Sequence, residues 1–277
     1  MKERVLTDDK ISSFAIYLKN EEKSKNTIEK YIRDVKLFFA YVKSVEITKE
    51  KVIAYKNKLI CDNYAIRSVN SMIASINSLF VFLGWLDLKA KNIKLQRQIY
   101  YPEEKELTKA EYRTAERKHN ERLNLILQTI CGTGIRVSEL RFITVEAVKS
   151  NVAIVSLKGK TRSVFIVKEL KKKLLRYAKN QNIKSGMIFV TRTGKAINRT
   201  NIWREMKSLC KDANVNPQKV FPHNLRHLFA RVFYGIEKDI AKLADILGHS
   251  SIDTTRIYII STGTEHRRCM ENMRLII

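Results

Sequence analysis

Residues 247–258 read LGHSSIDTTRIY, and residues 223–227 read HNLRH. The first stretch places Tyr258 nine residues after His249, and the second holds His223, Arg226 and a further histidine within five positions. Residues 132–140 read GTGIRVSEL, so Arg136 follows a Gly-Thr-Gly turn at the expected start of a short helix, 136–142. These three stretches concentrate the residue types that can perform chemistry, and the rest of the chain is interpreted outward from them.

The segment around these stretches mixes helices with a few strands. A basic turn, KGKTR, separates two apolar runs and predicts a hairpin with strands at 152–157 and 163–167. From Thr200 onward the pattern is helical in four or five short pieces. The remaining expected elements are a helix at 121–131, a basic helix at 169–179, a short strand at 187–190 and a tail helix near 264–275.

Residues 1–95 are predicted to be helical throughout. Thr7, Ser24 and Thr48 are N-cap residues, each followed by apolar residues at helical spacing, and a fourth helix is expected at about 66–84. Residues 96–106, QRQIYYPEEKE, show no periodicity and are the expected linker. The fold class is therefore an all-α domain at 1–95 and a mainly α domain at 107–277 with a small antiparallel sheet, of the α+β class.

The charge of the chain points to an anionic partner. The 277 residues carry 53 Lys and Arg against 28 Asp and Glu, a net charge of +25. Residues 1–100 hold 19 basic and 11 acidic residues (+8), which leaves 34 and 17 (+17) for the remainder, so both domains are basic. Nucleic acid and anionic membranes are the usual partners of such chains. The candidate contact residues are Lys25, Lys30, Arg33, Lys36 and Arg67, with Lys160 and Arg162 in the hairpin, and the alternative for them is a solvated face.

Several function classes lack their sequence signals. The N-terminal residues lack the apolar region of a signal peptide, and the longest apolar run, 79–86, is far shorter than a membrane span. The four cysteines are scattered, which suits a reducing cytosol and gives no zinc pattern. The GKT at 159–161 is not a phosphate-binding loop, because Ile154 stands where that motif needs glycine. We expect neither a metal nor a cofactor.

The arginines, lysine, histidines and tyrosine of these motifs are the residue types that metal-free phosphoryl transfer requires. Arginine binds phosphate oxygens bidentately and keeps its charge. A lysine can protonate a leaving alkoxide, and a histidine can relay a proton near neutral pH. A tyrosine hydroxyl becomes a nucleophile once cations or a base stabilise its phenolate. Arg136, Lys158, His223, Arg226, His249 and Tyr258 are the candidate catalytic residues.

These residues, in this order, resemble the active-site signature of tyrosine recombinases, the phage integrase and Xer group. The surrounding words agree, namely GTGIRVSEL, LRHLFA and LGHSSIDTTRIY, and Ser24, Thr27, Tyr31, Asp34 and Phe38 resemble the core-binding (SAM-like) domain of that family. The resemblance implies a core-binding domain at 1–95 and a catalytic domain at 107–277. It also implies that the tail helix near 264–275 docks on a neighbouring subunit through Met270, Met273 and Leu275, the alternative being packing on its own domain.

The resemblance implies a role for each candidate. Tyr258 attacks the scissile phosphate and forms a 3′-phosphotyrosyl bond, while Arg136 and Arg226 hold the phosphate. His223 assists proton transfer at the tyrosine, His249 bonds the phosphate, and Lys158 is the general acid on the 5′-oxygen. The family turn usually reads G-K-G-x-K, whereas here it is one residue shorter. This difference leaves two lysines as candidates for the general acid; we prefer Lys158 and keep Lys160 as the alternative.

Partners and function follow from the same resemblance. The partner is double-stranded DNA with an inverted-repeat core site, bound by a homo-tetramer or by a tetramer shared with a paralogous recombinase. Strand exchange passes through a Holliday junction and needs no ATP, for integration, excision or resolution of DNA. A type IB topoisomerase-like enzyme and a non-catalytic DNA-binding regulator are the alternatives. We expect a cytoplasmic, nucleoid-associated protein of bacterial origin that binds no membrane.

Overall fold

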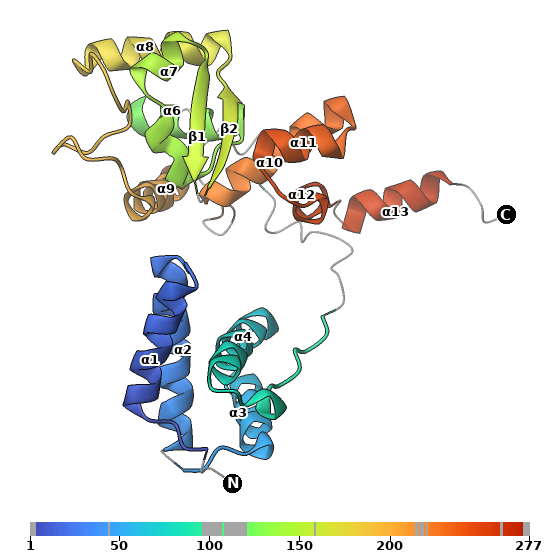
Figure 1. Ribbon diagram of the computed structural model, residues 1–277. Coiled ribbons are helices and arrows are strands. Elements are labelled where there is room, and N and C mark those ends of the chain that lie inside the picture. The colour runs from blue at the N-terminus through green and yellow to red at the C-terminus, as the bar shows by residue number, and fades with distance from the viewer. Residues whose placement is uncertain are drawn as a thin grey trace. The chain divides into compact units, whose positions relative to one another are not determined.

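The computed structural model describes residues 4–43, 45–95, 107, 121–157, 159–213, 216, 219, 221–260 and 263–273 (Figure 1). The chain divides into two compact units, Met1–Arg97 and Gln98–Ile277. The expected linker at 96–106 and the residue Lys158 lie outside the described residues. Each unit is built around its own hydrophobic cluster, so each is considered by itself.

The first unit is all-helical. Thr7, Ser24 and Thr48 each accept a backbone hydrogen bond at the start of a helix, so the predicted N-caps are confirmed. The fourth helix begins after Ala65 without a side-chain cap. The elements are α1 (Asp8–Asn20), α2 (Lys25–Val42), α3 (Lys49–Cys61), α4 (Ile66–Phe82) and a 3-10 turn, η1 (Leu86–Leu88).

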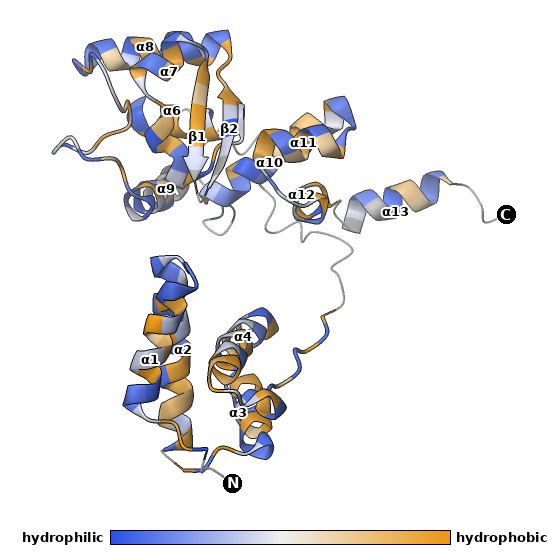
Figure 2. Ribbon diagram, in the orientation of Figure 1, coloured by the Kyte–Doolittle hydropathy of each residue, from blue (hydrophilic) through white to orange (hydrophobic). Residues whose placement is uncertain are grey.

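The core of this unit forms where the apolar faces of its helices meet. Phe14, Phe38 and Phe80, from α1, α2 and α4, are completely buried. Figure 2 shows hydrophobic and hydrophilic residues alternating around these helices, as an amphipathic pattern requires. One buried charge sits among them: Asp34 of α2 accepts a hydrogen bond from Ser75 Oγ of α4 at 2.8 Å and pairs with Lys30 Nζ at 2.7 Å.

From Glu121 onward, the described part of the second unit forms a helix, a 3-10 helix, a short helix and a hairpin. Helix α6 (Glu121–Thr133) runs two residues past the predicted end and stops before Gly134, whose φ is +65°. The 3-10 helix η3 (Val137–Phe142) and the short helix α7 (Val145–Lys149) follow. The antiparallel strands are β1 (Val152–Leu157) and β2 (Lys160–Phe165), and Leu157 pairs with Lys160. The sequence placed the second strand at 163–167, whereas the ladder runs from Lys160 to Phe165, because Lys160 and Thr161 of the basic segment also pair with β1.

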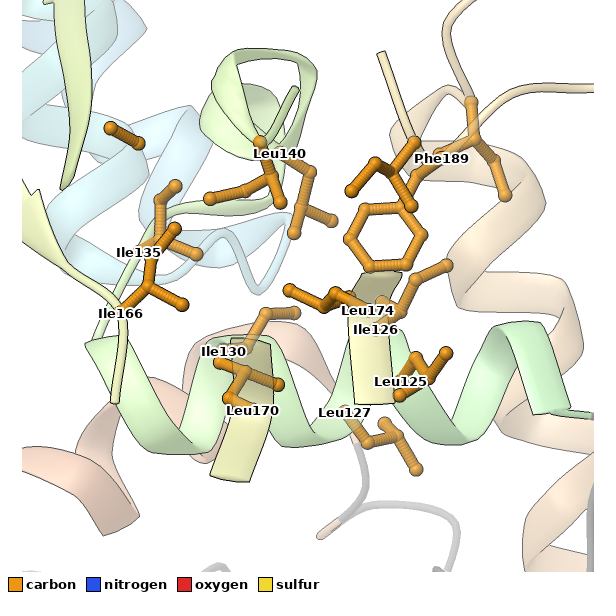
Figure 3. Packing of buried hydrophobic residues seen from close by; sticks show 14 of the residues in the cluster. Leu125, Ile126, Leu127, Ile130, Ile135, Leu140, Ile166, Leu170, Leu174 and Phe189 are labelled. Carbon is orange, nitrogen blue, oxygen red and sulfur yellow. The ribbon is translucent and has the colours of Figure 1, made fainter. Parts of the chain in front are cut away.

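A third strand does not form at 187–190. Met187 and Val190 each make one isolated bridge, to Thr144 and Ala196, so the described sheet has two strands. The apolar pattern that predicted a strand reflects burial instead, because Ile188 and Phe189 lie in the core. Figure 3 shows Phe189 in one cluster with Ile126 of α6 and Leu174 of α8 (Lys168–Asn180).

From Arg199 onward the described residues form five helices, in agreement with the four or five short pieces predicted from the sequence. They are α9 (Arg199–Ala213), α10 (Pro222–Glu237), α11 (Ile240–Leu247), α12 (Ile252–Ile259) and α13 (Gly263–Asn272). A small separate cluster of Ala230, Leu243, Leu247 and Tyr258 joins α10, α11 and α12. Throughout the described ranges, no helix combines the length and the apolar character that crossing a membrane requires.

Candidate active site

Helix α10 supplies two of the candidate side chains, His223 and Arg226, together with His227. Its first residue is Pro222, whose fixed φ suits the first turn and whose missing N–H costs nothing there. His223, Arg226 and His227 follow at positions i, i+3 and i+4, which share one face of a helix. That face meets α12, where Tyr258 lies, and α11, which ends at the turn that carries His249.

Arg226 is the most buried of the described candidate catalytic residues, with 2% of its surface exposed. Its Nη1 donates to the carbonyl oxygen of Gly134, and its Nη2 donates to the carbonyl oxygen of Leu247 at 2.6 Å. Burial, followed by the nearby Arg136, lowers its pKa to about 10, so the guanidinium stays charged at pH 7. The Nε of Arg226 is buried and has no hydrogen-bond partner among the described residues. An orphaned buried donor is costly unless a ligand satisfies it.

His249 is fixed in one tautomer by its two neighbours. Its Nε2 lies 3.0 Å from Nη2 of Arg226, and its Nδ1 lies 2.9 Å from Oγ1 of the buried Thr255. A guanidinium only donates hydrogen bonds, so Nε2 must accept. The proton of the neutral ring is then on Nδ1, which donates to Thr255. Thr255 was not predicted from its motif, although it lies three residues before Tyr258 and therefore on the same helical face.

Tyr258 lies at the centre of the aromatic side chains. It is 7% exposed, and its ring stacks on His227 with centroids 4.2 Å apart and planes 19° apart. The His223 ring meets it edge-on at 5.2 Å, the His249 ring lies at 5.1 Å, and the Arg226 guanidinium carbon is 5.8 Å from its centroid. The structure therefore brings His223, Arg226, His249 and Tyr258 together, and adds His227 as a packing partner of the tyrosine.

The histidines around Tyr258 are held neutral. Burial is the largest cause in each case, and the positive charge of Arg226 adds to it. The pKa of His223 is lowered, the pKa of His249 falls to about 4, and the pKa of His227 falls to about 3. At neutral pH the site can thus accept a proton on a histidine. A bound phosphate would raise these pKa values because it adds negative charge.

Arg136, at the start of η3, contacts the turn at Gly248 that precedes His249. Its Nη2 donates to the carbonyl oxygen of Gly248 at 3.4 Å, and its Nη1 pairs with Oε1 of Glu139 at 2.9 Å. Glu139 also accepts the backbone N–H of Arg136 at 2.8 Å and is itself 1% exposed. The Arg136 side chain is 40% exposed, so it is held by the protein on one side and open on the other.

Of the basic residues in the hairpin, only Arg162 has a described side chain. Arg162 lies against Glu139, with Nη2 at 2.8 Å from Oε2, and is 12% exposed. For Lys160 the backbone is described and the side chain is not, while Lys158 lies outside the described residues. The assignment of the general acid to Lys158 therefore stays a prediction.

The candidate DNA contacts of the first unit differ in their exposure to solvent. Lys25, Arg33, Lys36 and Arg67 are exposed. Lys30 is turned inward instead, because its Nζ donates to the Ser71 carbonyl oxygen at 2.6 Å and to Ser75 Oγ at 2.8 Å, next to Asp34. The other four remain available to a partner, and Lys30 neutralises a buried carboxylate.

Two family models match the chain. The one described as "Phage integrase family" covers residues 100–265, and the one described as "Phage integrase, N-terminal SAM-like domain" covers residues 11–86. The catalytic candidates from Arg136 to Tyr258 all lie within the first match.

Relatives and solved structures agree with these matches. The curated "Tyrosine recombinase XerA" of Pyrococcus horikoshii is 33% identical over 100% of this chain and 98% of its own length. The fold is similar to that of a lambda integrase dimer bound to a core site, with a TM-score of 0.76, 15% identity, and 93% and 96% of the two chains covered. It is also similar to a lambda integrase tetramer bound to a Holliday junction, with a TM-score of 0.74, 15% identity, and 92% and 77% covered.

Proposed function

The chain belongs to the phage integrase family of tyrosine-type site-specific recombinases, and from that premise we propose that Tyr258 cuts and rejoins duplex DNA. The observation that carries the proposal is the setting of Tyr258, whose ring is surrounded by His223, His227 and His249 beside the buried Arg226. Cations next to a phenol favour its ionised form, which is the nucleophile.

In the proposed step, Tyr258 Oη attacks the scissile phosphorus and the bond from phosphorus to the 5′-oxygen breaks. The products are a 3′-phosphotyrosyl bond and a free 5′-hydroxyl. The tyrosine proton passes to a neutral histidine, for which His223 is placed with its ring 5.2 Å from the Tyr258 ring. Lys158 donates a proton to the leaving 5′-oxygen, with Lys160 as the alternative. Reversal on a second strand conserves the bond energy, so no nucleotide is consumed.

Two arginines stabilise the charge on the phosphate oxygens. Arg136 offers the open side of its guanidinium, and Arg226 brings the buried Nε that lacks a partner among the described residues. Donors that are fixed before the reaction need no rearrangement when charge develops, which is the main source of stabilisation in phosphoryl transfer. His249 adds a third polar group beside Arg226.

We infer the assembly from the relatives and from α13. Lambda integrase has been solved as a dimer on a core site and as a tetramer on a Holliday junction. For this chain we propose a tetramer on an inverted-repeat site, made of four copies or shared with a paralogous recombinase. Met270 and Met273 of the tail are 70% and 57% exposed, which suits docking on a neighbour. Near the start of the same helix, Glu265 is held within its own unit by Arg231 at 2.7 Å.

The DNA substrate places the protein at the nucleoid, and this location is part of the proposal. The bacterial origin expected from the sequence stays a prediction, because XerA of Pyrococcus horikoshii matches the whole chain.

A suicide substrate tests the proposed function. The site is first footprinted with Tyr258→Phe protein on the DNA that flanks the gene, and a nicked duplex of that site is then prepared. The wild type should form a protein–DNA adduct that survives denaturation, and Tyr258→Phe should form none. Tyr234→Phe, another tyrosine of the same unit, is the matched control and should keep the adduct. No wild-type adduct, or an adduct that survives Tyr258→Phe, overturns the proposal.

A second assay separates recombination from relaxation. Two plasmid-borne copies of the site should yield strand-exchanged products. Relaxation of a supercoiled plasmid without exchanged products would favour the topoisomerase-like alternative, and tight binding with no adduct would favour the regulator.

A further inference from the structure

Arg162 is an arginine of the hairpin that points into the protein. From the sequence it was a candidate DNA contact, beside Lys158 and Lys160. In the structure it lies on β2 with 12% of its side chain exposed, and burial lowers its pKa while Glu139 opposes that effect. A side chain in this position is poorly placed to bind a phosphate of the DNA backbone, so another role has to explain it.

The partners of Arg162 belong to the site. Its Nη2 lies 2.8 Å from Oε2 of Glu139, and its Nη1 lies 3.4 Å from Oε1. The same carboxylate binds Arg136 through Oε1 at 2.9 Å. One buried carboxylate therefore joins a phosphate-binding arginine to the hairpin, and the forked geometry is one that arginine provides and lysine does not.

Arg162 also completes a row of three arginines at the end of α11. Its Nε donates to the carbonyl oxygen of Ile246 at 3.2 Å. The next two carbonyl oxygens, of Leu247 and Gly248, accept from Arg226 and Arg136. The last carbonyls of a helix lack intrahelical donors and carry partial negative charge, so cations stabilise them. The residue that follows this row is His249.

The contact between Arg162 and this turn is close. Gly248 has a φ of +64°, and a Cβ at that position would lie 2.5 Å from Cδ of Arg162. The glycine thus allows the left-handed turn and at the same time lets the arginine stem pack against the backbone. The hairpin and the turn of His249 are held together at this point.

We propose that Arg162 is a positioning residue that sets the hairpin, and with it the general-acid lysine, against the arginines that bind the phosphate. This inference rests on the proposed function. Strand β2 begins at Lys160, two residues after Lys158, so a tether at Arg162 restrains the chain that carries either lysine. Loss of the tether should impair protonation of the leaving 5′-oxygen more than attack by Tyr258.

The test compares two suicide substrates, one with the normal phosphodiester and one with sulfur in place of the 5′-bridging oxygen. A thiolate leaves without a proton, so the second substrate does not need the general acid. For Arg162→Ala we expect adduct formation on the normal substrate to slow by about 100-fold, within the range that general-acid catalysis supplies. On the sulfur substrate the loss should be at least ten times smaller.

Arg162→Lys is the second variant, since it keeps the charge and removes the fork. A DNA contact would survive this change, whereas the positioning role predicts the same substrate-dependent loss. Arg176→Ala, an exposed arginine of α8, is the matched control and should leave both rates unchanged. If Arg162→Ala does not fold, Arg162→Lys decides the question alone.

Two results would overturn the proposal. One is an equal loss on both substrates, which would mean a general structural role. The other is a shallower salt dependence of DNA affinity by about one unit of log K per log salt, the signature of a lost phosphate contact. Absence of a wild-type adduct on either substrate would instead contradict the proposed function itself.

Discussion

Among the described residues, each unit buries one carboxylate at a helix, and the strongest ion pair of that carboxylate is with a lysine in the first unit and with arginines in the second. Asp34 of the first unit is 2% exposed, lies 2.7 Å from Lys30 Nζ and accepts a hydrogen bond from Ser75. The exposed Arg33 is a more distant partner of Asp34, at 3.7 Å. Glu139 of the second unit is 1% exposed and is shared by Arg136 and Arg162. A lysine carries its charge on one nitrogen, and Lys30 directs that nitrogen at Asp34 and Ser75. Arginine brings a fork, so Arg136 can bind Glu139 and still present donors outward.

A buried carboxylate paired with basic side chains thus has a different role in each unit. In the first unit the ion pair lies within α2, and the hydrogen bonds that Asp34 and Lys30 make with Ser75 hold α2 against α4 beside the core. In the second unit the carboxylate fixes two arginines around the turn of His249, so the free energy that secures the fold also aligns the donors for a phosphate.

Replacing each carboxylate by its amide should separate the two roles. Glu139→Gln removes the charge that aligns two guanidinium groups, and a misplacement of about 1 Å in a catalytic site costs about 100-fold in rate. Asp34→Asn should lower the free energy of unfolding by about 1–3 kcal/mol, as for hydrogen bonds to charged groups, and leave the rate unchanged. Adduct rates per folded molecule and urea unfolding measure the two effects. A cleavage defect in Asp34→Asn as large as that in Glu139→Gln would contradict the distinction.

The glycine beside the arginine row should be far more sensitive than another glycine of the same unit. Gly248→Ala places a Cβ 2.5 Å from Arg162 Cδ at a φ of +64°, whereas Gly194, with a φ of +74°, has open space around it. Both changes carry the left-handed penalty of about 1–2 kcal/mol. Only Gly248→Ala should also slow adduct formation, by about ten-fold, because the turn of His249 must shift. Equal rates for the two variants would show that the close contact has no role in catalysis.

Acid should weaken the second unit before the first. Residues 1–97 contain no histidine, whereas His227 and His249 have folded pKa values of about 3 and about 4, below the 6.5 of an exposed histidine. A lowered folded pKa favours the neutral ring, so its contribution is present above pH 6.5 and is lost as the pH falls toward 4. Trp85 and Trp203 report the two units in urea titrations of single-tryptophan variants at pH 7.5 and 5. Equal loss in both units would contradict the prediction.

The smallest effect distinguishes the two basic residues of α2. The side chain of Arg33 is 68% exposed and lies 3.7 Å from Asp34, whereas that of Lys30 is 28% exposed and is bound to Asp34 at 2.7 Å and to Ser75. If Arg33 contacts a DNA phosphate, Arg33→Ala should reduce the slope of log K against log salt by about 0.9. Lys30→Ala should leave that slope unchanged and lower stability instead. Binding titrations over a series of salt concentrations measure both, and a reduced slope for Lys30→Ala would overturn the distinction.

Local signals in the sequence predicted well, and features set by distant partners did not. The caps at Thr7, Ser24 and Thr48 depend on three neighbouring residues, so they could be read directly. The strand expected at 187–190 failed because burial against α6 and α8 gives the same apolar pattern as a sheet. The inward orientation of the Lys30 and Arg162 side chains could not be predicted from the sequence either. Each is set by a carboxylate, and the one that turns Arg162 inward, Glu139, lies 23 residues away in the chain.

The candidate site was predicted in its chemistry but not in its support. His223, Arg226, His249 and Tyr258 form a group, as their motifs indicated. The tautomer of His249 and the contribution of Thr255 follow from hydrogen bonds that no motif specifies. The stacking of His227 on Tyr258 is likewise a result of how α10 meets α12.

The most direct test of the account is to locate the covalent bond. Adduct from the nicked suicide substrate is digested with protease and nuclease, and the modified peptide is sequenced by mass spectrometry. If Tyr258 is the nucleophile, a nucleotide is attached to Tyr258 through a 3′-phosphate and none is attached to Tyr234. A nucleotide on any other residue, or a Tyr258 peptide that stays unmodified in a sample containing adduct, would contradict it.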